Sequence, residues 1–127
     1  CAACHTEQHR KMLSDWKSLL NSEVADVEEV EKEARELFDE LKGRLDNQDL
    51  VQAQEMLAKG RELLNIVRVG NGVHNKKYAV NILDGAFANF EDTIELLEET
   101  NGSENLATIR QSTVAEGEEM LRRTRYE

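Results

Sequence analysis

Apolar residues recur every three or four positions along most of the chain, which is the spacing of one face of an α-helix. In the first stretch, residues 7–45, nothing compels a break, and the weakest point is Asn21-Ser22, because both residue types favour helix ends. A turn is expected from Gly43 to Asn47, with Asn47 as the candidate N-cap of the next helix. The apolar positions of this stretch are Met12, Leu13, Trp16, Leu19, Leu20, Val24, Val27, Val30, Ala34, Leu37, Phe38, Leu41 and Leu45.

A second helix is expected from about Gln48 to Val69, where apolar and small residues alternate in steps of three and four. Small residues on such a seam let a neighbouring helix approach closely. Gly70-Asn71-Gly72 is expected to end this helix, because glycine adopts the left-handed conformation of a helix C-cap without steric cost. The seam positions are Leu50, Ala53, Leu57, Gly60, Leu64 and Val67.

A third helix is expected after His74, with Asn75 as its cap, and Asn101-Gly102 is expected to end it. Its predicted core face consists of Ala79, Ile82, Leu83, Ala86, Phe87, Phe90, Ile94 and Leu97. Residues 103–127 carry a thinner apolar stripe and predict a fourth, weaker helix.

The composition agrees with a single helical domain spanning residues 1–127. A third of the residues are charged, 39% are hydrophobic and none is proline, which is typical of a helical bundle. We therefore expect an all-α fold, an antiparallel bundle of three long helices plus a weaker C-terminal helix. No apolar run approaches the ~20 residues that a membrane-spanning helix needs.

The formal net charge of −10 argues against a nucleic-acid partner, because no net positive field would attract a phosphate backbone. The acidic residues are concentrated in residues 23–49, with 11 acids and 4 bases, and in residues 78–105, with 7 acids and no base. Residues 1–22 and 50–77 are instead net positive. The simplest account is that helix faces of opposite sign pair across the bundle.

The motif that carries chemistry is Cys1-Ala2-Ala3-Cys4-His5, the C-x-x-C-H signal for a c-type haem. Two thiols three positions apart at the start of a helix can each bond one vinyl group of the same porphyrin, and the next residue places its imidazole on the iron. These are the only two cysteines of the chain. The sequence therefore predicts a covalently attached haem c, held by Cys1 and Cys4, with His5 as an axial ligand.

Other uses of the cysteines stay open. A zinc site would need two more ligands, which His9 and His74 would supply without the usual ligand spacing. A Cys1–Cys4 disulfide and inert thiols are further alternatives, whereas a thioredoxin-type pair would need a preceding strand. Because the chain begins with Cys1, we interpret it as a fragment or a processed product, and a lipid anchor on that cysteine is a minority alternative.

The motif is accompanied by Met12-Leu13 and Trp16, and by Gly-Val-His-Asn at 72–75 followed by Tyr78-Ala79. With these elements, residues 1–97 resemble the C-terminal domain of multihaem c-type cytochromes of anaerobic respiratory bacteria. In that family the Gly-Val-His-Asn element supplies an axial histidine, which implies that His74 is a haem ligand. The chain departs from the family in having a single C-x-x-C-H, so the resemblance implies that other haems lie upstream.

His74 also lies in a glycine-flanked loop, where the backbone can approach a flat macrocycle; the alternative is an exposed loop histidine that caps the third helix. The expected second helix is ~33 Å long, so His74 would lie about 33 Å from the turn at Gly43–Asn47. An unbroken first helix would place His5 ~60 Å from the same turn. The two histidines would then miss each other by roughly 20 Å or more. Either the first helix breaks near Asn21-Ser22, or His74 serves a different haem.

Other residues could also approach a haem. His9 follows His5 by one helical turn, so it cannot reach the opposite side of the same haem; it is expected on the surface or at a neighbouring haem. Met12, Met56 and Met120 are alternative axial sulfurs, and Met12 is expected in the core beside Trp16. Cations that would suit haem propionates are Arg10, Lys11, Arg68, Lys76 and Lys77.

These residues predict an electron-transfer module of a c-type cytochrome and no enzymatic activity, because no Ser/His/Asp set, phosphate loop or carboxylate pair is present. The expected partners are redox proteins, neighbouring haem domains or a second copy of the chain. Haem attachment needs dedicated maturation, so a periplasmic or extracellular location is expected. The alternative is a structural or interaction bundle, haem-free or zinc-stabilised, that docks against a larger cytochrome or itself.

Overall fold

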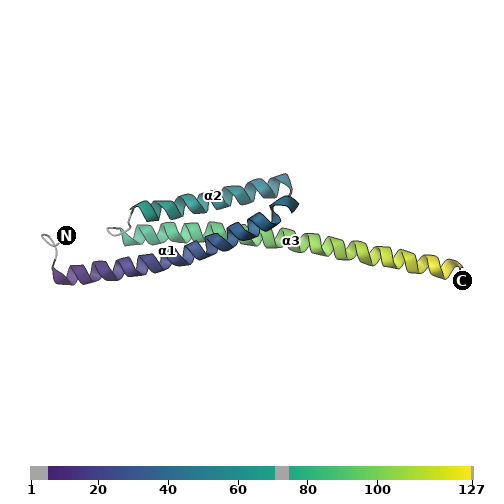
Figure 1. Cartoon of the computed structure of the whole chain (residues 1–127), viewed down its shortest axis with the longest axis horizontal. Helices are drawn as coiled ribbons and strands as arrows, with labels where there is room; N and C mark the ends of the chain where they lie inside the picture. Colours follow the sequence, from purple (N-terminus) through teal and green to yellow (C-terminus); the bar gives the residue numbers. More distant parts are fainter. Residues whose placement is uncertain (1–5, 71–74, 127) are drawn as a thin grey trace.

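The computed structural model describes the backbone of residues 6–70 and 75–126 and the side chains of residues 6–70 and 75–103. Within these ranges the chain is helical and contains no strand. Its elements are α1 (Glu7–Leu41), a short 3₁₀ turn η1 (Lys42–Arg44), α2 (Asn47–Gly70) and α3 (Lys76–Tyr126). Figure 1 shows that α2 returns along the bundle and that α3 runs back beside it, so the three helices pack together as predicted.

The helix starts follow local capping rules. Asp46 is the N-cap of α2, because its Oδ1 accepts a hydrogen bond of 2.7 Å from the Asp49 backbone N–H. The sequence-based choice of Asn47 was wrong by one residue, since Asn47 is the first residue of the helix. Asn75 is confirmed as the cap of α3, where its Oδ1 accepts the Tyr78 N–H at 3.1 Å.

Helix α1 runs without a break through Asn21 and Ser22. Both side chains are exposed, so they can hydrogen-bond to water without disturbing the helix, while Leu20 and Val24 on either side pack against the core. At 1.5 Å per residue, the 35 residues of α1 make a rod of ~52 Å. It is longer than the 24-residue α2 that returns along it.

Helix α3 does not end at Asn101-Gly102, and this prediction was wrong. The helix continues to Tyr126, so residues 103–126 extend α3 and do not form a separate fourth helix. A glycine inside a helix costs only ~1 kcal/mol relative to alanine, and it stops a helix only where the chain adopts a left-handed conformation. Gly102 keeps the helical conformation, and α3 projects past the turn between α1 and α2 (Figure 1).

The core is a seam of apolar side chains between the three helices. On α2 the predicted seam is confirmed at five positions, since Ala53, Leu57, Gly60, Leu64 and Val67 are buried. The facing residues of α3 are Ala79, Leu83, Ala86, Phe90, Thr93 and Leu97, all buried. Small residues on both helices bring α2 and α3 close together, as the sequence pattern indicated.

Charged side chains connect α1 and α2 outside this core. The Arg68 guanidinium donates to Glu28 Oε1 at 2.8 and 3.1 Å, and Arg61 Nε lies 3.3 Å from Glu31 Oε1. Glu31 is the most enclosed of these groups, with a side chain only 14% exposed. The predicted pairing of oppositely charged helix faces is therefore present between these two helices.

Candidate functional site

The four residues predicted to hold the haem, Cys1, Cys4, His5 and His74, lie outside the described residues. The structure does describe what borders them. Thr6 and α1 follow His5 directly along the chain, and Asn75 follows His74 as the cap of α3. The described part of the candidate site is therefore the surface that these neighbours form.

The start of α1 is organised by Thr6. Its carbonyl oxygen accepts hydrogen bonds from the backbone N–H groups of His9 at 3.0 Å and Arg10 at 3.2 Å. Its hydroxyl lies 2.9 Å from His9 Nδ1, and the tautomer of the ring decides which group donates. His9 is exposed, as one of the two sequence-based alternatives expected, and its ring is engaged with its own helix start. Of the four ligands suggested for zinc, His9 is the one inside the described part of the chain.

The start of α1 extends beyond the start of α3. Lys76 Nζ at the beginning of α3 lies 5.9 Å from the centroid of the Trp16 ring, a distance at which an ammonium group is attracted to an aromatic face. The helix from Glu7 to Trp16 spans nine residues and therefore ~14 Å. Figure 1 shows this segment projecting past the neighbouring ends of α2 and α3.

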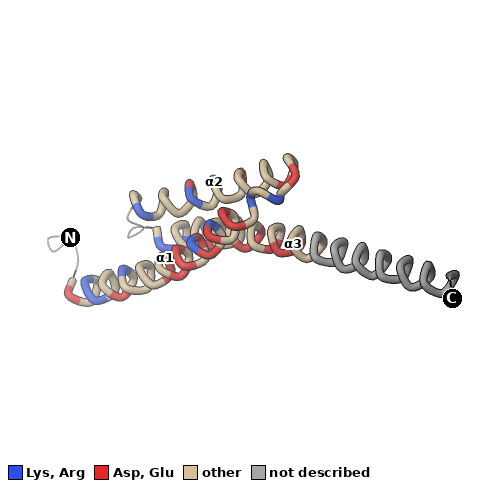
Figure 2. Tube along the Cα trace, turned by 45° about the vertical axis from the view of Figure 1, so that its right-hand side comes forward, with Lys and Arg blue, Asp and Glu red and all other residues tan. Residues whose placement is uncertain are grey.

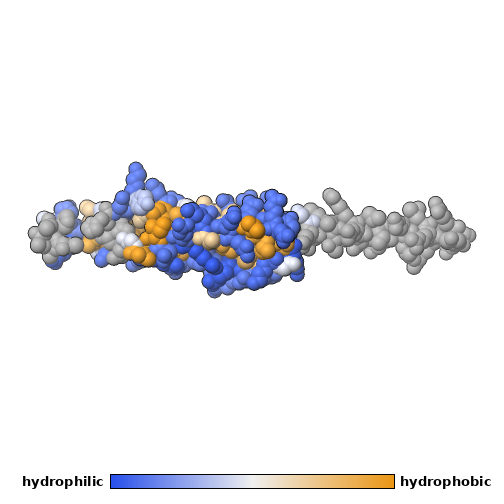
Figure 3. Space-filling view, turned by 90° about the horizontal axis from the view of Figure 1, so that it is seen from above, coloured by the Kyte–Doolittle hydropathy of each residue, from blue (hydrophilic) through white to orange (hydrophobic). Residues whose placement is uncertain are grey.

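This end of the bundle exposes large apolar side chains. Among the described residues, the large hydrophobic side chains that remain exposed here are Met12, Leu19, Ile66, Val69 and Tyr78. Val51, near the opposite end, is the remaining one. Val27 is the first buried residue of α1, so the helix has no buried side chain in its first five turns. Figure 3 shows hydrophobic surface appearing in separate patches among hydrophilic side chains on one face of the molecule.

Met12 therefore does not lie in the core, and this expectation was wrong. Its side chain is 43% exposed, and Trp16 beside it is only half-buried. The apolar stripe of α1 extends further than the neighbouring ends of α2 and α3, so within the described ranges no helix packs over the first turns of α1 (Figure 1). The same stripe pattern serves as core in one half of the helix and as surface in the other.

The charges at this end differ from those of the remaining bundle. We define the open end as residues 7–19, 66–70 and 75–80, which contain six Lys and Arg and two Asp and Glu. The acidic body, residues 20–65 and 81–103, contains six Lys and Arg and 19 Asp and Glu. Figure 2 shows the acidic residues gathering along the middle of α1 and on α3.

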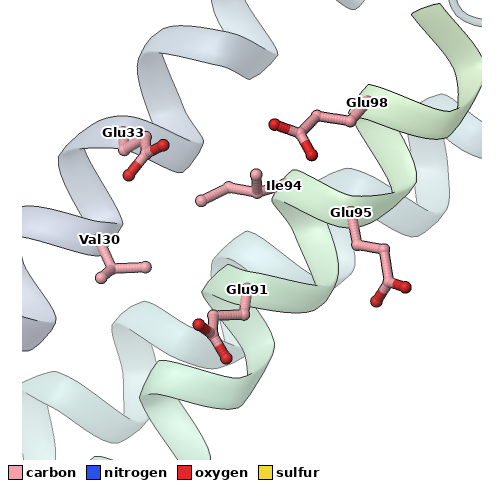
Figure 4. Close-up of a pocket in the computed structure, with 6 residues that line it drawn as sticks. All are labelled: Val30, Glu33, Glu91, Ile94, Glu95 and Glu98. Carbon is pink, nitrogen blue, oxygen red and sulfur yellow. The ribbon is translucent and has the colours of Figure 1, made fainter. Parts of the chain in front are cut away.

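A second feature is a groove of about 400 Å³ between α1 and α3. Its apolar floor is Val30 and Ile94, and four glutamates line it: Glu33, Glu91, Glu95 and Glu98. In Figure 4, Glu33 on α1 faces Glu91 and Glu98 on α3, whereas Glu95 points away from α1. The sequence indicated the acidity of these segments, but it did not show that two helices far apart in the chain bring these residues together.

The described residues contain no group of three or more His, Cys, Asp or Glu side chains arranged to hold a metal ion. In the same part of the chain, no helix has a stretch long and apolar enough to cross a membrane.

Comparison of the chain with protein-family models, with curated proteins and with solved structures gives no match. The resemblance to multihaem cytochromes therefore rests on the quoted sequence elements alone.

Proposed function

We propose that the chain is an electron-transfer module of a c-type cytochrome, with one haem attached through Cys1 and Cys4 and with His5 as an axial ligand. The observation that carries this proposal is the C-x-x-C-H motif placed directly before the first turn of α1. Residues 6–11, which follow the motif, are all exposed and Met12 adds apolar surface, so the start of α1 is accessible to a group attached beside it. The haem would supply one-electron cycling of its iron.

The protein's own contribution would be to hold the haem at the end of a rigid rod. Helix α1 is continuous from Glu7 onward, so a group attached just before it is carried at the tip and away from the acidic body. Electron transfer of this kind needs no catalytic acid, base or nucleophile, and we propose no enzymatic activity. Because haem attachment depends on dedicated maturation, we propose a periplasmic or extracellular location.

His74 is proposed as the ligand of a different haem from the one at Cys1 and Cys4. A break near Asn21-Ser22 would have folded the motif back towards His74, but α1 has no break there. The motif directly precedes the projecting end of α1 along the chain, whereas His74 directly precedes Asn75, at the start of α3. The ~14 Å of α1 that projects beyond the start of α3 separates the residues that directly follow the two histidines along the bundle and supports separate haems. The second haem would belong to a neighbouring haem domain or to a second copy.

The test is an optical spectrum after expression with the periplasmic cytochrome maturation machinery. We expect sharp α and β bands on reduction with dithionite, and covalent haem that survives denaturing electrophoresis. The double variant Cys1→Ala/Cys4→Ala should lose the covalent haem, while the matched surface variant Ser18→Ala should keep it. Absence of the bands from matured wild-type protein would refute the haem assignment, and loss of a low-spin spectrum in His74→Ala would refute the proposal of separate haems.

The second candidate is a structural or interaction bundle that carries no haem. It is favoured by the groove between α1 and α3, whose apolar floor and glutamate walls are open to solvent. This candidate predicts a folded helical protein without any cofactor. Circular dichroism of the Cys1→Ala/Cys4→Ala variant measures whether the bundle folds without haem, and circular dichroism of the wild type with and without a zinc chelator measures whether it needs metal.

A further inference from the structure

The charge of the molecule is segregated along its length. The open end has a formal charge of +4, from six bases and two acids, whereas the acidic body carries −13. One of the two acids of the open end, Glu7, pairs with Arg10 at 3.4 Å, and the other is Asp15. The overall charge of −10 therefore hides a positive surface at the end that follows the C-x-x-C-H motif.

Four of the cations at this end have no ion pair among the described residues; Lys76 lies over the Trp16 ring, and the other three are Lys11 and Lys17 on α1 and Lys77 on α3. Lys11, Lys17 and Lys77 are exposed, whereas Lys76 is half-buried.

The nearest acids offset part of this charge, because Arg68 is paired with Glu28 and Glu23 lies six helical residues, ~9 Å, from Lys17. From Glu31 onward the acids of α1 are ~21 Å or more from Lys17, beyond the Debye length of ~8 Å at physiological ionic strength, so they act only weakly on Lys11 and Lys17.

The exposed apolar side chains lie among these cations. Met12 and Leu19 alternate with Lys11 and Lys17 along the same turns of α1, and Tyr78 follows Lys77 on α3. An apolar centre with charged side chains around it is the usual composition of a transient protein interface. Complementary charge sets the orientation and the rate of such an encounter more than its final strength.

We propose that the open end is a docking surface for an acidic partner protein, and that the acidic body turns such a partner towards this end by repelling it elsewhere. This rests on the proposed electron-transfer function, because it names the partner that would approach the haem end. The recognised chemistry is a carboxylate-rich surface with an apolar centre. The contact is end-on and limited to the tips of three helices. This geometry suits a protein surface better than a membrane, because a membrane-bound amphipathic helix lies flat in the interface along its whole length.

The test uses a gold sensor that carries a mixed monolayer of carboxylate-terminated and methyl-terminated thiols, with adsorption followed by surface plasmon resonance. Although the protein is acidic overall, the wild type should adsorb at low ionic strength and be released at high ionic strength. The variant Lys11→Glu/Lys17→Glu/Lys77→Glu should bind at least about tenfold more weakly, because three attractions become repulsions. The matched control is Lys32→Glu/Lys42→Glu/Lys59→Glu, which changes the net charge equally on the acidic body and should keep most of the adsorption.

Equal loss in both triple variants, or no adsorption of the wild type, would overturn the docking surface. Vesicles of phosphatidylglycerol and phosphatidylcholine provide the second arm, read through the fluorescence of Trp16. A blue shift of this emission on vesicles, at ionic strength where the carboxylate monolayer no longer binds, would assign the surface to lipid and overturn the protein assignment. Adsorption does not require haem. Adsorption without the haem bands would therefore refute only the proposed function, and haem bands without adsorption would refute only the docking surface.

Discussion

The Phe90 ring on α3 lies against the backbone of Gly60 on α2, so that a Cβ atom at position 60 would come within 2.5 Å of Phe90 Cε1. Phe90 is fully buried, with neighbours on all sides, and its ring cannot move away without displacing them. This contact sets how closely α2 and α3 approach.

Gly60→Ala is therefore expected to destabilise the bundle by about 1–3 kcal/mol, because the cost of overpacking exceeds the gain of ~1 kcal/mol in helix propensity. Urea denaturation followed by circular dichroism measures the change. Phe90→Leu in the Gly60→Ala background makes room for the methyl group and should restore part of the loss. A stability equal to or above the wild type in Gly60→Ala would contradict this packing.

Gly102→Ala is expected to stabilise the protein, in contrast to Gly60→Ala. Nothing lies within 4 Å of a Cβ added at Gly102, and the residue is inside α3 in a helical conformation. The substitution should raise helicity and stabilise the protein by about 0.5–1 kcal/mol, which is the difference in helix propensity between glycine and alanine. A destabilised Gly102→Ala would instead indicate a left-handed helix end at this position, and would restore the break that the sequence suggested.

Asp46→Ala is expected to cost about 1 kcal/mol, because the Asp49 N–H at the start of α2 loses its side-chain acceptor. Asn47→Ala is the matched control and should be close to neutral, since Asn47 is the first helical residue. Thermal unfolding of both variants compares the two positions directly. If Asn47→Ala cost more than Asp46→Ala, the cap would be misassigned.

The pair Arg61–Glu31 is expected to contribute more than the pair Lys59–Glu62. Glu31 has a side chain only 14% exposed, whereas both members of the second pair are more than half exposed. A double-mutant cycle with alanine at each position should give a coupling of about 0.5–1 kcal/mol for Arg61–Glu31 and near zero for Lys59–Glu62. Both couplings should fall as salt is added. Equal couplings would show that burial of Glu31 does not strengthen its ion pair.

Local sequence signals predicted those features of the helices that depend on residues close together in the chain. Glu7 as the first helical residue, Asn75 as a cap and the seam of α2 all follow from the periodicity and from capping chemistry. The helix end predicted at Asn101-Gly102 is absent, because a glycine permits a helix end but does not require one. Asp46 caps α2 in place of the predicted Asn47 for a similar reason, since both residue types can cap a helix and only the backbone geometry selects between them.

The sequence by itself determined that the chain is helical, that its helices have one apolar face, and that its two cysteines stand in a C-x-x-C-H motif. These properties depend on the spacing and chemistry of nearby residues. Only the tertiary structure decided that Met12 and Leu19 are exposed, that Val30 and Ile94 share a groove, and that the cations of three separate segments meet at one end. The physical reason is that the relative lengths and positions of the packed helices decide which part of each apolar stripe is covered. Those contacts join residues far apart in the chain.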